Sequence, residues 1–148
     1  MSDVLSESDR LASWREHFEA FPFYRFLGIA IEEVRAGYAR ISMPNGPNTL
    51  GGVGGSVHGG ILASLVDIAM LQALVPMFEE GDLPGGTMDL GITYLRPALG
   101  PSVTAEANVL RKGRQVAVTE VEIKDAEGRL CAKGRTLYSL RRQEAERA

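Results

Sequence analysis

One carboxylate stands alone in an apolar stretch of the chain. From 61 to 78 the sequence reads ILASLVDIAMLQALVPMF, in which Asp67 is the only charged residue. An ionised carboxylate among aliphatic side chains is strongly destabilised unless a partner compensates its lost hydration. A residue kept at that cost beside a polar pocket is a candidate for catalysis. We therefore expect Asp67 to act as a base or a nucleophile. A buried carboxylate tied to backbone or threonine donors is the structural alternative.

The segment just before this stretch could bind a carbonyl oxygen. Ser56-Val57-His58-Gly59-Gly60 opens the predicted helix, whose first backbone amides have no partner inside the helix. The two glycines let a ligand approach closely, and the positive end of the helix favours developing negative charge. The sequence predicts an oxyanion site here, with His58 as a cap, a substrate contact or a proton carrier. Glycines selected for tight packing are the alternative.

The spacing of these two features bears on assembly. Gly59 and Asp67 are eight residues apart, which on a helix is about 12 Å and too far for both to act on one carbonyl. A second copy with its helix running antiparallel would bring one acid beside the other glycine, and a two-fold axis would build two identical sites. The spacing therefore predicts a homodimer, or a dimer of dimers.

The elements that must position these residues indicate an α+β domain. The 148 residues suit a single domain with its own core, with 1–27 as an N-terminal helical segment and 142–148 as a frayed polar tail. A helix is expected at 6–20, a polar break at 79–86, and a long loop at 44–57. Alternating apolar residues predict strands at 29–36, 38–43, 87–96, 102–111, 115–124 and 129–141. Consecutive hairpins require antiparallel strands, so we predict a sheet wrapped around one apolar helix.

Composition excludes several other classes of protein. The net charge of −3 and the pI near 5.4 argue against a nucleic-acid partner. A charge at mid-membrane depth costs at least about 2.5 kcal/mol, so Asp67 argues against a membrane span. No secretory signal is visible and there is one cysteine, so we expect a cytoplasmic protein. Two distant histidines and that cysteine offer no ligand cluster, so no metal is expected.

Two motifs resemble a known family. The pattern HGG-x4-L-x-D-x-A from His58, followed by T-x-D-x5-L-R-P from Thr87, resembles the hot-dog fold acyl-CoA thioesterases of the phenylacetate-degradation type. The resemblance covers residues 25–140 and implies the hot-dog fold. It implies that Asp67 activates water or attacks the thioester, and that Gly59 supplies the oxyanion amide. It further implies that Thr87 assists Asp67 and that His58 lies near the thioester.

The resemblance also sets expectations for the substrate. Members of the family carry Asn or Gln six residues before the histidine, where this chain has Gly52, and we expect Asn48 to fill that role. No cofactor is implied beyond the CoA of the substrate. Contacts to the substrate are expected from Gly60 and Ser64, and contacts to the CoA phosphates from Arg96, Lys112 and Arg114. An acyl pocket that favours medium-chain or aryl groups is expected from Phe23, Phe26, Met70, Leu71 and Phe78.

Two other functions remain open from the sequence. Since Gly52 departs from the family pattern, the protein could bind acyl-CoA with little or no catalysis. A hydratase or dehydratase acting on acyl thioesters is a second alternative, although the sequence lacks a matching pair of histidine and acid in proline-rich loops.

Overall fold

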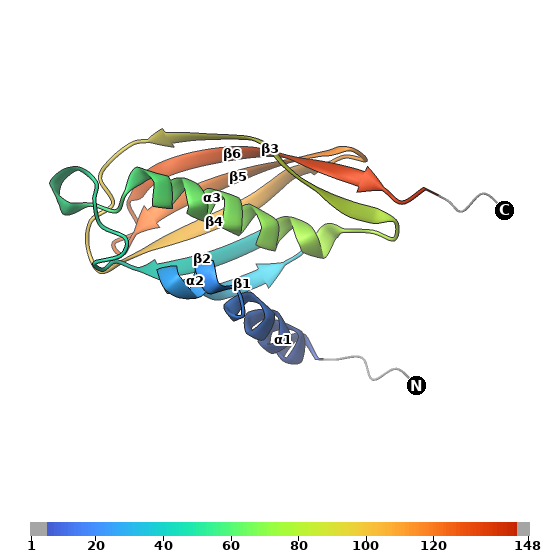
Figure 1. The fold of residues 1–148 in the computed structure, drawn as a ribbon, viewed down its shortest axis with the longest axis horizontal. Coiled ribbons are helices and arrows are strands. Elements are labelled where there is room, and N and C mark those ends of the chain that lie inside the picture. The colour runs from blue at the N-terminus through green and yellow to red at the C-terminus, as the bar shows by residue number, and fades with distance from the viewer. Residues whose placement is uncertain (1–5, 145–148) are drawn as a thin grey trace.

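An antiparallel sheet of six strands wraps around one long helix, α3 (Figure 1). The computed structural model describes residues 6–144. The strands, in the order β1-β2-β4-β5-β6-β3 across the sheet, are β1 (Ala30–Arg35), β2 (Tyr38–Pro44), β4 (Ser102–Lys112), β5 (Val116–Asp125), β6 (Leu130–Arg142) and β3 (Asp82–Tyr94). All pairings are antiparallel. This confirms the predicted α+β class and the sheet folded around a helix.

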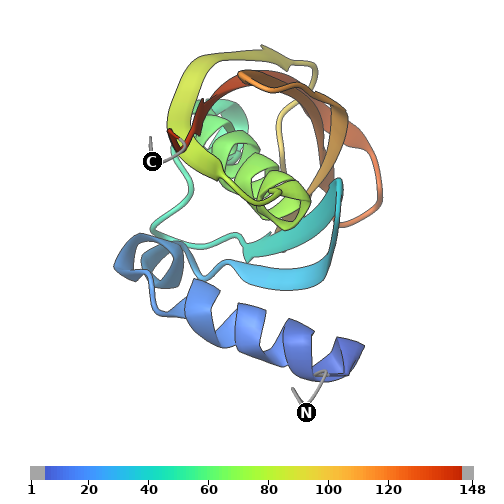
Figure 2. The same ribbon diagram turned by 90° about the vertical axis from the view of Figure 1, so that its right-hand side faces the viewer.

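Helix α3 (Gly59–Leu74) is the centre of the core, and a short 3-10 turn, Val75–Met77, extends it. The stretch is long and apolar enough to cross a membrane by length and composition. In this molecule the sheet curls around it instead (Figure 2). Leu65, Val66 and Met70 are fully buried against the strands. At Gly134 of β6 the helix comes so close that an added Cβ would lie 2.6 Å from Val66 Cγ1. The apolar run is therefore a core helix.

Two helices precede the sheet and lie outside its wrap (Figure 2). Helix α1 (Glu7–Glu19) begins after Ser6, whose hydroxyl caps it by accepting from the Asp9 amide at 3.2 Å. Its Arg15 Nε donates to the Ile31 carbonyl at 3.0 Å and so covers the outer edge of β1. Helix α2 (Pro22–Leu27) starts at a proline and ends at Gly28, which has φ 72°. Both helices lie within the segment 1–27 expected to be helical, of which the structure describes residues 6–27.

The predicted loop 44–57 is confirmed in outline. It holds one 3-10 turn, Val53–Gly55, and a single β-bridge between Leu50 and Val57. The loop leads directly into α3, because the amide of Val57 donates to the Ala98 carbonyl at 3.0 Å and the amide of His58 donates to the Thr49 carbonyl at 2.9 Å. These bonds fix the approach of the chain to the first turn of the helix.

Strand β3 differs from its prediction. It starts at Asp82, inside the segment expected to be a polar break, because Asp82 and Leu83 pair with the far end of β6. Pro84 is tolerated there because β3 is an edge strand. Two bulges interrupt the register, and the side chains of Met88 and Tyr94 are 60% and 52% exposed.

The end of the chain also differs from its prediction. Strand β6 includes Arg142, so the polar tail begins one residue later than expected. The part of the predicted tail at 145–148 lies outside the described residues.

Candidate active site

The first turn of α3 leaves one backbone amide unused. His58 caps the helix, and its Nδ1 accepts from the Gly60 amide at 2.9 Å. The amides of Ile61 and Leu62 both donate to the His58 carbonyl, at 2.9 and 3.2 Å. Within residues 6–144 the Gly59 amide has no such acceptor. Gly59 is thus the free donor of this turn, at the end of the helix that favours negative charge.

The capping bond engages one nitrogen of His58. Nδ1 is the acceptor for the Gly60 amide, so it presents a lone pair to the helix. The ring is exposed, and no hydrogen bond within residues 6–144 engages its other nitrogen. His58 is therefore a helix cap that also occupies the Gly60 amide, which leaves the amide of Gly59 as the one aimed outward.

Asp67, near the middle of α3 (Gly59–Leu74), keeps one oxygen free of partners among the described residues. The hydroxyl of Thr87 on β3 donates to Asp67 Oδ1 at 2.7 Å, so the structure brings these two predicted residues together. Within residues 6–144 no hydrogen bond and no cation reaches Asp67 Oδ2. The side chain is partly buried. A carboxylate oxygen without a partner can accept a proton from water or attack a carbonyl carbon.

Asp67 opens into a cavity of about 380 Å³ with aromatic and aliphatic walls. The expected substrate contacts Gly60 and Ser64 line this cavity, and the Ser64 hydroxyl donates to the Gly60 carbonyl at 3.0 Å. The remaining walls are Phe23, Tyr24, Ala63, Ile68 and Leu90. Such a space suits an apolar group next to the carboxylate.

Two phenols lie close enough to Asp67 to be affected by its charge. Burial raises the pKa of Tyr24, and the negative charge of Asp67 raises it further. Burial also raises the pKa of Tyr138; a hydrogen bond from the Gly86 backbone opposes this rise, and the charge of Asp67 adds to it. Both phenols therefore stay protonated at neutral pH, and Tyr24 presents its ring to the cavity. Neither was singled out from the sequence, because their proximity to Asp67 depends on how α2 and β6 pack.

Gly59 opens into a different cavity, of about 420 Å³. Its lining includes Leu62 from α3 and Tyr94, Leu95 and Arg96 from the end of β3 and the segment after it. None of the residues that line this cavity lines the cavity of Asp67. Within one chain, the amide and the carboxylate therefore serve separate openings, as their spacing on the helix predicts.

The family's amide side chain has no room at Gly52. A Cβ at this position would collide with the Ser56 hydroxyl and would lie 2.7 Å from the Val57 carbonyl oxygen. The Gly52 amide already donates to the Ser56 carbonyl at 2.9 Å. Asn48, expected to substitute, is exposed and lines neither cavity described above. The structure does not bring Asn48 to Gly59 or Asp67.

The three predicted phosphate contacts are placed very differently. Arg96 is exposed and lines the Gly59 cavity. Arg114 is exposed in the turn between β4 and β5. Lys112 is instead partly buried, with its Nζ 2.7 Å from Asp82 Oδ2 and 10% of its side chain exposed. The expectation for Lys112 needs correction, because this buried ion pair holds its ammonium group.

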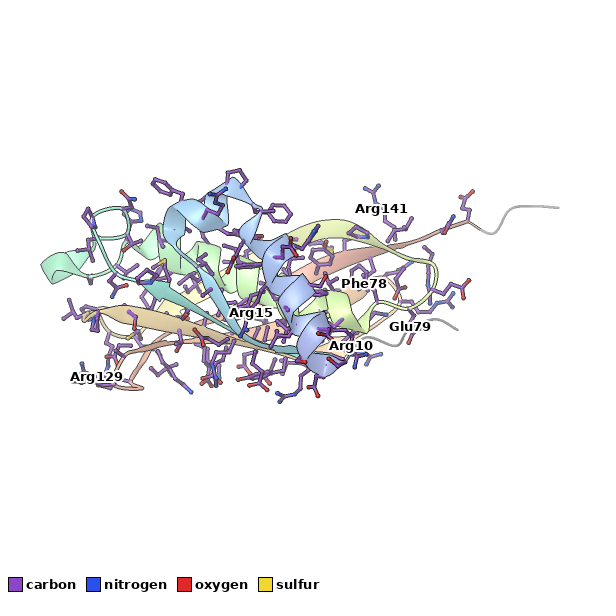
Figure 3. All side chains as sticks on the ribbon, turned by 90° about the horizontal axis from the view of Figure 1, so that it is seen from below. Arg10, Arg15, Phe78, Glu79, Arg129 and Arg141 are labelled. Carbon is purple, nitrogen blue, oxygen red and sulfur yellow. The ribbon has the colours of Figure 1, made fainter. Side chains whose placement is uncertain are left out.

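The expected acyl pocket is only partly assembled. Phe23 lines the Asp67 cavity, and Met70 is fully buried in the core. Phe26 faces a separate cavity with Asn48. Figure 3 places Phe78 beyond the end of α3, at the end of the molecule opposite Arg129. Leu71 is partly buried against the core. The walls that sequence reasoning missed, Tyr24, Ala63, Ile68 and Leu90, carry no pattern that separates them from ordinary core residues.

Comparison with known proteins gives a consistent result. The family model described as the thioesterase superfamily matches residues 54–132. The chain is similar to the medium/long-chain acyl-CoA thioesterase YigI of Escherichia coli, with 33% identity over 95% of this chain and 99% of that protein.

Two solved structures have the same fold. The thioesterase HI1161 of Haemophilus influenzae superposes with a TM-score of 0.80 at 25% identity, covering 93% of this chain and 94% of that one. The BH2602 protein of Bacillus halodurans, solved with CoA, superposes with a TM-score of 0.72 at 27% identity, covering 90% and 85%.

Proposed function

The chain belongs to the thioesterase superfamily and is a thioester hydrolase, and from this premise we propose that it hydrolyses acyl-CoA to the free acid and CoA. The observation that carries the proposal is the unpartnered Oδ2 of Asp67, which faces a cavity with apolar walls. A relative named as an acyl-CoA thioesterase and a similar structure solved with CoA support this substrate. We further assign the chain to the phenylacetate-degradation type, on the motifs that begin at His58 and Thr87.

We propose that the working unit is a homodimer with two shared sites. Strand β3 pairs with β6 along one edge, and no strand within residues 6–144 pairs with its other edge. This edge is 13 residues long and carries exposed apolar side chains, including Met88. A long unpaired edge of this kind favours pairing with a second copy. A two-fold axis there would turn the Gly59 opening of one protomer toward Asp67 of the partner subunit.

The proposed reaction uses few groups. The thioester oxygen accepts a hydrogen bond from the Gly59 amide, which stabilises the negative charge that develops on it. In one route, Asp67 of the partner subunit takes a proton from water while the water oxygen bonds to the carbonyl carbon. The C–S bond then breaks, and CoA leaves as a thiolate that takes up a proton. In the other route, the carboxylate itself bonds to the carbon and expels the thiolate, and water then hydrolyses the mixed anhydride.

We propose a medium-chain or aryl acyl group for the Asp67 cavity. Its volume and its aromatic wall from Phe23 and Tyr24 support a group larger than acetyl. Arg96, which lines the Gly59 opening, is the cation best placed to meet a CoA phosphate. We also propose a cytoplasmic location, which the free, buried Cys131 supports because thiols persist in reducing compartments.

The proposal is tested by measuring CoA release with a thiol-reactive dye. The substrates would run from acetyl-CoA to palmitoyl-CoA, with benzoyl-CoA and phenylacetyl-CoA as the aryl members. Hydrolysis with the highest kcat/KM for a medium-chain or aryl substrate is expected. Saturable binding of acyl-CoA without release of CoA would instead favour the weakly catalytic binder, for which the blocked position at Gly52 is the specific observation.

A further inference from the structure

Tyr94 touches the proposed oxyanion turn directly. It is the last residue of β3, and its hydroxyl donates to the Gly59 carbonyl at 2.6 Å. Its ring also covers the glycine, because a Cβ added to Gly59 would lie 3.1 Å from Tyr94 Cζ. Both residues line the same cavity. No other side chain within residues 6–144 hydrogen-bonds to the Gly59 backbone.

The backbone that carries Tyr94 is itself fixed. The amides of the next two residues, Leu95 and Arg96, both donate to the Cys131 carbonyl, at 2.8 and 3.1 Å. The phenol thus reaches the helix from a point anchored to β6. Gly59 and Gly60 have no side chains to restrain them, and the first turn of a helix has few internal bonds, so this turn is loose without an external contact.

We propose that Tyr94 is a positioning residue that holds the Gly59–Gly60 peptide and thereby keeps the neighbouring Gly59 amide pointed into the active site. An amide that must meet a developing oxyanion contributes most when its direction is set before the reaction. The phenol and the His58 cap hold the two ends of the peptide that follows the Gly59 Cα, its carbonyl and the Gly60 amide. The peptide that carries the free Gly59 N–H is held at its own carbonyl, that of His58, by the amides of Ile61 and Leu62. Gly59 therefore connects two restrained peptides. This role rests on the proposed thioesterase function.

The first test is Tyr94→Phe, which removes only the hydroxyl. We expect kcat to fall about tenfold with little change in KM, less than the hundredfold or more seen when an oxyanion donor is lost outright. Tyr38→Phe is the matched control, since it also removes a phenol hydrogen bond, to Glu106 at 3.0 Å, but next to Gly37, whose amide bonds to Ala73 at the end of α3 opposite Gly59. Equal kcat values for the two variants would overturn the proposal.

The second test asks whether Tyr94 acts through the Gly59 amide. Gly59→Pro removes that amide proton at the first helical position, where proline is well accepted, and His58 before it has a compatible φ of −58° and ψ of 132°. Gly59→Ala adds the same Cβ but keeps the proton, and controls for contact with the Tyr94 ring. In the proline background Tyr94→Phe should cost nothing further. A full additional loss of activity would contradict the proposed route.

The third test does not depend on activity. Amide hydrogen exchange measured by NMR should be faster at Gly60, whose amide is bonded to His58 Nδ1, in Tyr94→Phe, and unchanged there in Tyr38→Phe. Unchanged exchange at Gly60 in Tyr94→Phe would overturn the positioning role. A wild-type protein that releases no CoA from any acyl-CoA would overturn the proposed function, and with it the catalytic meaning of this contact.

Discussion

Asp67 and Asp82 are two carboxylates of one chain with opposite surroundings. Asp82, at the start of β3, has no exposed side-chain area. It lies 2.7 Å from Lys112 Nζ and 3.2 Å from Arg142 Nη1, and it accepts from the Glu79 amide at 2.9 Å. Asp67 has one neutral donor, Thr87, and an oxygen that faces a cavity.

The difference separates a structural acid from a candidate catalytic one. Two cations and an amide neutralise and immobilise Asp82, so its charge holds the ends of β3, β4 and β6 together. Asp67 is oriented by a single hydroxyl and is not neutralised, which leaves its charge available to a substrate or to water. The apolar neighbours of Asp67 identify it from the sequence as a candidate catalytic residue. Nothing comparable in the sequence distinguishes Asp82 as a buried structural acid.

The largest effect on activity is expected from Asp67→Asn. The amide oxygen can still accept from Thr87, so the fold and Tm should be kept, but the base or nucleophile is lost. We expect the rate of CoA release to fall at least tenfold. Asp89→Asn, at an exposed position of β3, is the control and should leave the rate unchanged. A fully active Asp67→Asn variant would remove the basis of the comparison.

Asp82→Asn should have the reverse profile. It leaves the Lys112 ammonium buried without its carboxylate, so Tm should drop by several degrees while the kcat of the folded enzyme stays close to wild type. Thermal unfolding and initial rates below the transition check both parts. A large loss of kcat at unchanged Tm would mean that Asp82 is not a structural acid.

The pH dependence of stability provides a further test of Asp82 as a structural acid. The hydrogen bond from the Lys112 ammonium, followed by the bond from the Glu79 amide, holds the pKa of Asp82 below its usual value. The carboxylate therefore adds stability above the pKa of an unfolded Asp, about 3.9, and this stability is lost as pH falls through the folded value. The difference in Tm between wild type and Asp82→Asn should shrink on going from neutral pH to below about pH 4. A constant difference would contradict the ion-pair origin.

The smallest effect is expected from Thr87→Val. This substitution removes the only hydrogen bond that the Asp67 carboxylate accepts within residues 6–144, and it keeps the β-branched shape on an exposed edge strand. The carboxylate should remain but lose its orientation, so kcat should fall a few-fold while Tm changes little. Steady-state kinetics at saturating substrate provide the measurement. A loss as large as that of Asp67→Asn would give Thr87 a direct chemical role.

Much of the fold follows from local patterns. Alternation in β4, β5 and β6 predicts both their extent and their buried faces, because each strand has one side against α3. The start of β3 could not be found this way. Its first residues become strand only by pairing with Arg141 and Arg142, more than fifty residues later in the chain.

The candidate site likewise has features that local sequence predicts and features that depend on distant parts of the chain. The motif around His58 and Asp67 identifies the groups that can do chemistry, and the helical rise predicts that they serve separate openings. The ion pair of Lys112 and the lack of space for a side chain at Gly52 depend on neighbouring residues that approach only in the folded chain. In the sequence Tyr94 is indistinguishable from an ordinary strand residue. Only the structure shows that its hydroxyl donates to the Gly59 carbonyl.

A purified heterodimer that pairs a Gly59→Pro chain with an Asp67→Asn chain tests the shared site most directly. Either variant alone should be nearly inactive. In the heterodimer, the intact amide of one chain meets the intact acid of the other at one of the two sites. About half of the wild-type rate should therefore be recovered. A heterodimer no more active than its parents, with both chains folded and associated, would contradict a site built from two protomers.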